Sequence, residues 1–387
     1  MKALKRYIVI TILFISNLTF AQTYNNFYGD IVNSYSSDSV YNNLIEFENL
    51  GIKEPGTAAL NNTLNWLINK YNNYGYTDIE IDTLNYGGFE VYNLIVTKLG
   101  TQFPTTYLII DGHYDTKSGT GTNDNGSGTS IILETARLLK NVNTEYSIKF
   151  IHFTVEEAGL VGSSYYVNNT VIPQNMDIKL VFNIDEVGGV NGMTNNTIVC
   201  ERDQSNPTLS NAASAACTDT LATCVSLYSS LLTEISFAYS SDYMPFQANE
   251  NIITGLFEKN QSPHPHTPTD NIGNMDVNYV YEITQATIGA SLYFAVAHQF
   301  DVGIESSTTI SRIQVYPNPA KEQLTINLGN LPLENTTLQL INIVGEIVLE
   351  KTINYKIEQL DLKDISTGIY TLIISSPSFQ ITKKVVH

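Results

Sequence analysis

Apolar runs of strand length alternate with helical stretches from about residue 24 to residue 300. The strand-length runs are "TYLIID" (106–111), "IKFIHFTV" (148–155), "IKLVFNID" (178–185) and "IITGLF" (252–257). Runs as continuous as these are typical of strands that are covered on both faces. The helical stretches lie at 60–75, 129–140 and 277–300. This alternation predicts an α/β domain with a mixed, largely parallel central sheet flanked by helices.

The pattern changes near residue 301. A serine- and threonine-rich stretch, "DVGIESSTTISRI", is followed by "QLTINL", "TLQLINIVGEIV", "IEQLDL", "GIYTLIIS" and "QITKKVV". Short segments in which apolar and polar residues alternate, separated by Gly, Asn, Asp or Pro, are strand signals. Their spacing predicts a small all-β sandwich of roughly seven strands. We place the linker at 301–308 and the second domain at 309–387.

The first 21 residues have the features of a secretory signal. Basic residues within 2–6 precede an apolar stretch at 7–20, and Thr-Phe-Ala at 19–21 fits a cleavage site. This predicts a signal peptide over 1–21 and a secreted protein. The apolar stretch is short for a membrane-spanning helix of ~20 residues, and no later segment is long and apolar enough. We therefore expect no stable membrane span.

Charge and cysteine content limit the possible partners and cross-links. The chain has 38 acidic and 20 basic residues and no basic cluster beyond its first few residues, so nucleic acid is not an expected partner. In an exported protein, Cys200, Cys217 and Cys224 can form one intrachain disulfide at most. The sequence does not identify the pair. We favour Cys200 with Cys224, because "TIVCER" and "LATCVSLY" both look like strands. Three cysteines without a CxxC make a poor zinc site.

Histidine and acidic residues follow the ends of the apolar strands. In chain order they are His113 and Asp115 in "GHYD", Asp124 in "NDNGSG", Glu156 and Glu157 in "VEEAG", Asp185 in "NID", and His264, His266 and Asp270 in "HPHTPTD". In an open α/β sheet the carboxyl ends of the strands converge on one crevice, where ligands bind. Each motif alone is common in turns or at helix starts. Their joint occurrence at strand ends predicts one site.

Divalent cations explain why imidazoles and carboxylates would gather there. Carboxylates in a partly dry site repel one another and take up protons, and cations remove that conflict. Histidine with Asp or Glu, without thiolates, suits catalytic zinc, with manganese or cobalt as substitutes. A paired site lowers the pKa of a shared water and needs one further carboxylate to move protons. Adjacent Glu156 and Glu157 can supply a base and a ligand, so the site needs no nucleophilic side chain.

GHYD, NDNGSG, VEEAG, NxD and HTPxD resemble, in this order, the metal motifs of the secreted co-catalytic di-zinc aminopeptidases. That family contains the vibriolytic and streptomycete aminopeptidases, and the resemblance covers most of residues 40–300. It implies the zinc exopeptidase fold over 22–300 and two Zn²⁺ ions. The metal ligands it implies are His113, Asp124 as the bridge, Glu157, Asp185 and His266. It also implies that Glu156 is the general base, that Asp115 orients His113, and that His264 is a bystander.

The chain departs from the family pattern at two positions. Many members have a histidine where "SSDYMPF" has Tyr243, and some carry a tyrosine before the last histidine ligand, where Pro265 stands here. Tyr243 could supply the missing oxyanion donor, although Ser240, Asp242 and Tyr243 equally suit loop structure. We therefore include Tyr243 among the candidate catalytic residues.

The resemblance implies a secreted metalloaminopeptidase. It would hydrolyse the N-terminal peptide bond of peptides that have a free N-terminus, using a di-zinc-activated water and a glutamate base. A metallocarboxypeptidase, a dipeptidase or a glutaminyl cyclase on the same scaffold are the alternatives among enzymes, and a non-catalytic binding module is the alternative from another class. The cyclase branch uses one zinc, so the complete ligand set counts against it, as it does against the binding module.

The C-terminal segment has its own resemblance. "VYPNPAKEQLTINL", "IEQLDLKDISTGIYTLIIS" and the final "TKKVVH" resemble the sorting domain of proteins exported by the type IX system of Bacteroidetes, over roughly 309–387. This implies that the segment is recognised by the secretion machinery and has no catalytic part. The protein would then be extracellular or attached to the cell surface. An ordinary β-sandwich module that binds carbohydrate or protein has the same periodicity.

Overall fold

The computed structural model describes residues 22–299, 313–329, 333, 336–343, 345–376 and 379–387. The predicted signal peptide (1–21) and linker (301–308) lie outside the described residues. The chain divides into two compact units, Met1–Gln299 and Phe300–His387. None of the helices in the described part of the chain has the length and apolarity needed to cross a bilayer.

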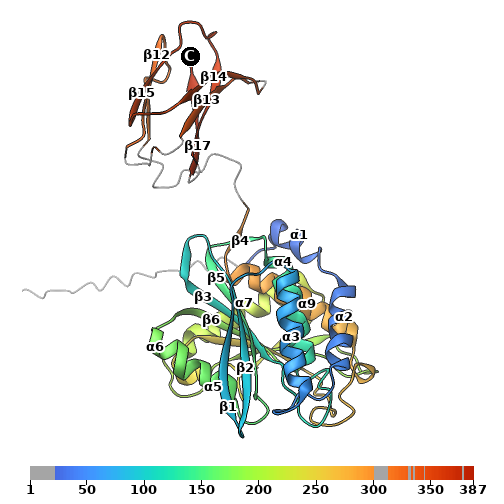
Figure 1. The fold of residues 1–387 in the computed structure, drawn as a ribbon. Helices are drawn as coiled ribbons and strands as arrows, with labels where there is room; N and C mark the ends of the chain where they lie inside the picture. The colour runs from blue at the N-terminus through green and yellow to red at the C-terminus, as the bar shows by residue number, and fades with distance from the viewer. Residues whose placement is uncertain (1–21, 300–312, 330–332, 334–335, 344, 377–378) are drawn as a thin grey trace, which may run out of the picture. The chain divides into compact units, whose positions relative to one another are not determined.

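The first unit is built on a sheet with the strand order β1-β2-β5-β3-β6-β9-β7-β8 (Figure 1). These strands are β1 (Ile79–Tyr86), β2 (Phe89–Lys98), β3 (Phe103–His113), β5 (Tyr146–Phe153), β6 (Asp177–Ile184), β7 (Thr197–Arg202), β8 (Leu232–Phe237) and β9 (Ile253–Glu258). The central strands β5, β3, β6 and β9 are parallel, whereas β1 and β2 form an antiparallel hairpin at one edge and β7 is antiparallel to β9. The predicted mixed, largely parallel sheet is confirmed.

Helices cover both faces of the sheet. One layer contains α1 (Asn26–Val32), α2 (Ser37–Asn49), α3 (Ala58–Asn73), α4 (Gly126–Leu139), α7 (Asn211–Tyr228) and α9 (Val277–Phe294). The other contains α5 (Val161–Tyr166), the π-helical turn η1 (Val167–Val171), α6 (Ile172–Gln174) and α8 (Met244–Ala248). Two smaller elements are the pair β4 (Asn143–Thr144) with β10 (Ala297–His298) and the 3-10 turn η2 (Ile272–Asn274).

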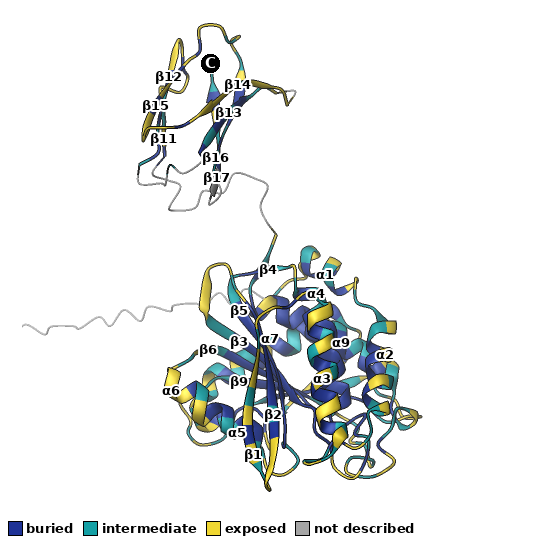
Figure 2. Ribbon diagram, viewed as in Figure 1, coloured by how far each residue is buried: buried dark blue, intermediate teal, exposed yellow. Residues whose placement is uncertain are grey.

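The central strands are buried on both faces. Successive residues of a strand point to opposite faces, so Leu108 and Ile110 of β3 join the core under α3, α4 and α9. Ile109 joins the second core, which contains Phe153 and Phe246 under α5 and α8. Figure 2 shows the sheet interior as buried. Burial on both faces explains why these strands appear in the sequence as uninterrupted apolar runs.

One local prediction was wrong. "LATCVSLY" is not a strand but the end of helix α7, in which Leu221, Cys224, Val225 and Tyr228 are buried at helical spacing. The favoured disulfide therefore does not join two strands, and the structure holds Cys200, Cys217 and Cys224 as free thiols.

Helix α5 begins only at Val161, after the "VEEAG" motif. Val155 and Leu160, which flank this turn, have φ angles of 56° and 60°. These left-handed conformations do not belong to a right-handed helix, so the chain makes a turn before α5 starts.

The second unit consists of antiparallel strands in its described residues. They are β11 (Gln314–Tyr316), β12 (Gln323–Asn327), β13 (Thr337–Ile341), β14 (Ile347–Thr352), β15 (Ile357–Asp361), β16 (Ile369–Ser376) and β17 (Phe379–Val386). They form two sheets, β11-β12-β15 and β14-β13-β16-β17, around a core that includes Leu324, Leu340 and Leu372. Buried and exposed residues alternate along β12, β13 and β16, as expected when one face of each sheet is packed on the core. The predicted all-β C-terminal unit is confirmed.

Candidate metal centre

The predicted site residues gather at the carboxyl ends of the central parallel strands. His113 is the last residue of β3, and Asp124 lies on the loop between β3 and α4. Glu157 follows β5, Asp185 follows β6, and His266 lies on the loop after β9. The edge of the sheet at which ligands bind in open α/β folds is therefore the edge that carries these side chains.

Asp124 lies between two groups of side chains that could hold a metal ion. Its Oδ1 is 3.2 Å from Nε2 of His113, and its Oδ2 is 3.2 Å from Nε2 of His266. Asp185 Oδ1 is 3.3 Å from the same His113 nitrogen, and Glu157 Oε2 is 2.6 Å from the His266 nitrogen. In each group, His113–Asp124–Asp185 and Asp124–Glu157–His266, the potential ligand atoms lie within 4.8 Å of one another. The structure thus brings all five predicted ligands together.

The loop that carries Asp124 is fixed from two sides. The Asp270 carboxylate accepts the backbone N–H groups of Asn123 (2.8 Å) and Asp124 (3.1 Å). At the start of α4, a Cβ on Gly128 would collide with the carbonyl oxygen of Ile184 at the end of β6. A glycine at this position therefore lets the loop approach the strand that leads to Asp185.

Asp115 holds the neighbouring turn. Its buried carboxylate accepts the N–H of Glu156 at 3.0 Å and the N–H of Glu157 at 3.3 Å. The nearest acceptor for Nδ1 of His113 is the Asp115 backbone carbonyl at 3.1 Å, whereas the Asp115 carboxylate lies at 3.7 Å. A histidine whose second nitrogen meets an acceptor is oriented for binding a metal through the first. One residue therefore positions both the histidine and the glutamate pair.

The two adjacent glutamates have different surroundings. Glu157 belongs to the group with Asp124 and His266, whereas Glu156 belongs to neither group. Glu156 Oε2 lies 3.9 Å from Nε2 of His113, and the residue lines the cavity beside the two groups. Its carboxylate is thus next to the two groups of potential ligands without belonging to either.

The electrostatics of the cluster suit divalent cations. Burial raises the pKa of Glu156 and of Glu157 to about 9; His113 opposes this shift, and neighbouring carboxylates add to it. Burial alone would lower the pKa of His113, but the negative charges of Asp185 and Glu156 outweigh it and raise that pKa well above its ordinary value. Cations bound here would stabilise the ionised form of these carboxylates and so lower their pKa values.

Unused ligand atoms support the same conclusion. Glu157 Oε1 and Asp185 Oδ1 are buried and have no hydrogen-bond partner in the described part of the chain. Buried carboxylate oxygens without donors cost free energy unless a cation or a donor meets them. The donor set of two imidazoles and three carboxylates, without thiolates, is of the kind that zinc takes in catalytic sites. The residues present therefore fit a pair of divalent cations.

Residues 93–290, just over half of the chain, match Peptidase family M28. The chain belongs to peptidase family M28. Residues 314–387 match the secretion system C-terminal sorting domain. The two matches fall within the two structural units.

Curated relatives match part of this M28 chain. Aminopeptidase YwaD of Bacillus subtilis is 34% identical over 196 residues, which are 49% of this chain and 41% of the relative. Leupeptin-inactivating enzyme 1 of Streptomyces exfoliatus is 33% identical over 150 residues, which are 38% of this chain and 34% of the relative. The matched region thus spans less than half the length of each of these relatives.

Solved structures share the fold. The Legionella pneumophila LapA aminopeptidase has a TM-score of 0.62 at 20% identity, covering 76% of this chain and 81% of that chain. Porphyromonas gingivalis glutaminyl cyclase has a TM-score of 0.55 at 19% identity, covering 66% and 98%. At these identities the likeness concerns the fold alone, which both activities use.

Tyr243 lies close to the centre but is engaged elsewhere. Its ring is buried and lines the cavity of this M28 unit. The hydroxyl donates to Glu201 Oε2 at 2.6 Å and accepts the N–H of Tyr239 at 3.1 Å. The proton that an oxyanion donor would supply is therefore directed to Glu201.

A neighbouring serine was not selected from the sequence. Ser241 Oγ lies 2.7 Å from Asp185 Oδ2 and 3.0 Å from Asn183 Oδ1, so it can donate to the Asp185 carboxylate. It belongs to "SSDYMPF", where the sequence analysis considered Ser240, Asp242 and Tyr243. The only sequence signal for Ser241 was its place in this short polar segment, where many family members have a histidine at the position of Tyr243.

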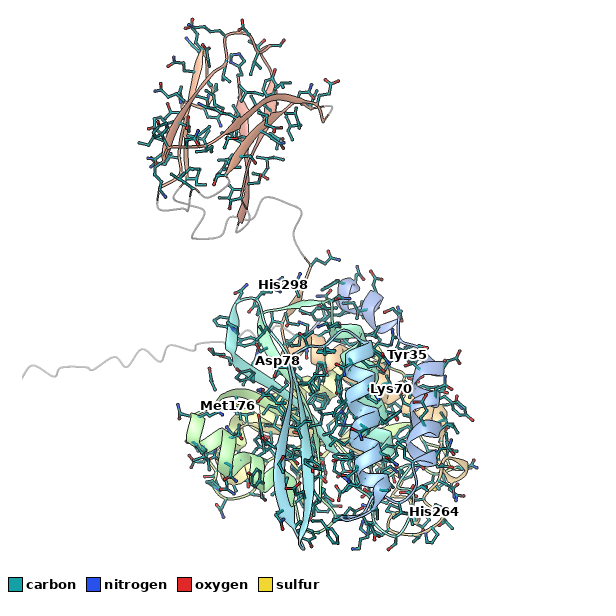
Figure 3. The ribbon with its side chains drawn as sticks, viewed as in Figure 1. Tyr35, Lys70, Asp78, Met176, His264 and His298 are labelled. Carbon is teal, nitrogen blue, oxygen red and sulfur yellow. The ribbon has the colours of Figure 1, made fainter. Side chains whose placement is uncertain are left out.

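His264 stands apart from the cluster, as the resemblance implied. Its Nδ1 lies 2.8 Å from Oγ1 of Thr269, within the same loop. Figure 3 labels it at the lower right edge of the first unit. The two histidines of "HPH" thus have different partners, and of the two only His266 joins a group of potential metal ligands.

Proposed function

We propose that this chain is a secreted metalloaminopeptidase that releases the N-terminal residue of peptides, with two zinc ions in the groups His113–Asp124–Asp185 and Asp124–Glu157–His266. The observation that carries the proposal is the position of Asp124, whose two oxygens each face a histidine of a different group. Membership of family M28 and the relative named aminopeptidase support it.

Five side chains of the first unit would hold the ions. His113 and Asp185 would hold one ion, Glu157 and His266 the other, and Asp124 both. When bound, such ions supply Lewis acidity, which lowers the pKa of a water and polarises a peptide carbonyl.

Proton transfer falls to Glu156. It takes a proton from the water as the water oxygen attacks the carbonyl carbon, and it gives that proton to the leaving amine as the C–N bond breaks. Asp115 keeps the backbone of Glu156 in place, and Ser241 orients Asp185 by the hydrogen bond to its Oδ2.

The predicted oxyanion role of Tyr243 requires that its hydrogen bond to Glu201 be exchanged when substrate binds. A Tyr243→Phe variant tests this role. A fall in kcat at unchanged KM supports the oxyanion donor. A changed preference among substrates at similar kcat instead indicates that Tyr243 acts by positioning Glu201.

We further propose that residues 1–21 are a signal peptide, that 22–300 form the catalytic domain, and that 309–387 direct type IX export. The sorting-domain match supports the last point. Expression in a bacterium that has the type IX system tests it. The full chain is expected in the medium or on the cell surface, whereas a chain that ends at residue 312 is expected to stay in the cell envelope.

The enzymatic proposal is tested on the full chain. Bound zinc is measured by mass spectrometry, and release of product is followed from aminoacyl anilides with free N-termini, from N-blocked anilides and from carboxypeptidase substrates. The proposal predicts two zinc ions and cleavage of free N-termini only, lost in Glu156→Gln.

Each alternative has its own outcome. Cleavage of C-terminal substrates or of dipeptides alone would indicate a carboxypeptidase or a dipeptidase. Cyclisation of N-terminal glutamine with one bound zinc would indicate a glutaminyl cyclase. A folded protein that binds no metal and cleaves nothing would indicate a binding module.

A further inference from the structure

The cavity beside the metal centre extends past the proposed ligands. It has a volume of about 470 Å³, and the residues that line it beyond the proposed ligands include Glu186, Glu201, Tyr239 and Phe257. Glu186 follows Asp185 at the end of β6, Glu201 lies in β7, Tyr239 follows β8, and Phe257 lies in β9. We call the part of the cavity that these four residues line the Glu201 pocket.

Glu201 is buried at the wall of this pocket with one carboxylate oxygen free. The residue is 4% exposed, and its Oε2 accepts the Tyr243 hydroxyl. Its Oε1 accepts no hydrogen bond from the described residues. Gly255 on the neighbouring strand makes room for this arrangement, because a Cβ there would come 2.8 Å from the Tyr243 ring and 3.2 Å from Glu201 Oε2.

No lysine or arginine of the described residues neutralises the pocket. Glu186 and Glu201 form no ion pair there, and the cavity lining contains neither lysine nor arginine. Burial raises the pKa of Glu201 to about 8. The hydrogen bond from Tyr243 opposes this shift, and the negative charge of Asp185 adds to it. A cation that enters the pocket pairs with the ionised carboxylate and displaces its proton.

The remaining walls of the pocket are aromatic. The rings of Tyr239 and Phe257 meet edge to face with their centroids 6.5 Å apart, and both line the cavity. Aromatic walls that lead to a carboxylate match a side chain with an apolar stem and a cationic tip, since the stem packs on the rings and the tip pairs with the charge. A leucine side chain would touch the same rings but leave Glu201 desolvated and unpaired.

We propose that the Glu201 pocket receives the side chain of a basic N-terminal residue, lysine or arginine, and that Glu201 determines this specificity. The inference rests on the proposed aminopeptidase function and names its substrate class. Glu186 directly follows the proposed ligand Asp185, whereas Glu201 lies on β7 and is paired with Gly255, two residues before Phe257 of β9.

The test compares lysyl and norleucyl anilides on the zinc-loaded full chain. Norleucine has the length of lysine without its charge, so the ratio of the two kcat/KM values isolates the contribution of the cation. We expect the lysyl substrate to be favoured at least ~tenfold. In Glu201→Gln, which keeps the shape and an acceptor for Tyr243, this ratio falls at least ~tenfold.

Glu234→Gln is the matched control. It removes one carboxylate from exposed strand β8, where Glu234 pairs with Lys259 outside the cavity. The same change in net charge should leave the lysyl-to-norleucyl ratio unaltered. A fall in that ratio here would mean that the general negative charge of the protein selects the substrate, and it would overturn the assignment to Glu201.

Two kinetic results would contradict the inference. One is a wild-type enzyme that cleaves the norleucyl anilide as well as, or better than, the lysyl anilide. The other is an equal loss of both activities in Glu201→Gln, which would assign Glu201 to the α-ammonium group common to all N-termini.

If neither anilide is cleaved, the proposed function fails and the pocket is tested by binding. L-lysine should then raise the Tm of the zinc-loaded chain more than L-norleucine does, and Glu201→Gln should abolish the difference. Equal shifts would overturn the pocket assignment on its own.

Discussion

Buried acidic groups around the candidate metal centre of the first unit have different surroundings from the buried acidic group of the second unit. In the first unit Asp115, Asp124, Glu201 and Asp242 are each less than a tenth exposed, and none forms an ion pair with a lysine or arginine of the described residues. In the second unit Glu358 is 7% exposed and pairs with Lys351 at 2.7 Å, above a core of mainly aliphatic side chains.

This difference indicates what each unit requires of its interior. In a region that only has to fold, such as the second unit, apolar packing is enough and a buried charge is paired with an opposite one. Where cations and a charged substrate are to bind, carboxylates are kept in place without protein counter-charges, and two apolar cores on either side of the sheet stabilise the surrounding structure. The predictions below test this contrast, from the largest expected effect to the smallest.

The largest effect is expected from Glu156→Gln in the first unit. Because Glu156 moves protons and binds no cation in this account, kcat should fall about 10²–10⁴-fold while zinc content stays unchanged. Steady-state kinetics and mass spectrometry measure the two quantities on the same sample. A loss of zinc together with activity would show that Glu156 is a ligand and that Glu157 needs another role.

A core substitution in the second unit should act on stability alone. Leu372 in β16 is fully buried, so Leu372→Ala should lower the free energy of unfolding of this unit by about 2–5 kcal/mol. Calorimetry of the full chain should show the unfolding transition of the second unit moving to lower temperature while kcat/KM on an N-terminal anilide is unaltered. A parallel loss of activity would mean that the two units do not act separately.

Stability of the first unit should decrease in mild acid through His152. This buried histidine contacts the Tyr71 hydroxyl at 2.9 Å, and burial lowers its pKa to about 3. Between that value and the ordinary pKa of about 6.5, the unfolded chain binds a proton that the folded chain does not. The free energy of unfolding therefore falls as pH falls, by up to ~1.4 kcal/mol per pH unit.

Urea unfolding at pH 7 and at pH 5.5 measures the effect of His152. In His152→Phe the difference between the two pH values should shrink by about 1.3 kcal/mol, whatever the variant's stability at pH 7. An unchanged difference would show that other groups, not His152, carry the acid sensitivity.

The smallest effect is expected from removing the second unit. All proposed ligands and Glu156 lie before residue 299, so a chain that ends there should keep the kcat/KM of the full chain on an N-terminal anilide. The two purified forms are compared side by side. A large fall in activity of the shorter form, with its zinc retained, would give the second unit a part in catalysis.

The central strands and the five proposed ligands could be predicted from sequence because the relevant signals are local. β3, β5, β6 and β9 are covered on both faces and so form uninterrupted apolar runs, and each run is followed by one of the motifs. The edge hairpin β1–β2 was not predicted, since the burial pattern along β1 is irregular. Near Cys224 the apolar run was too short to show its helical period.

The supporting residues depend on contacts between distant segments. Ser241 contacts Asp185 across 56 residues, and Tyr243 contacts Glu201 across 42 residues. No spacing rule reports such pairs, because they depend on the order of strands in the sheet. The Glu201 pocket likewise combines residues that follow or lie in four strands, so its charge and shape become visible only in the folded chain.

The most direct test of the account is the zinc stoichiometry of the full chain and of three ligand variants. Because Asp124 belongs to both groups of potential ligands, we predict two zinc ions in the natural chain and weaker binding of both ions in Asp124→Asn. Asp185→Asn and Glu157→Gln should each lose one ion, because each of these residues belongs to one group only. A single tightly bound zinc that Asp124→Asn leaves in place would contradict the shared-carboxylate centre on which the proposed function rests.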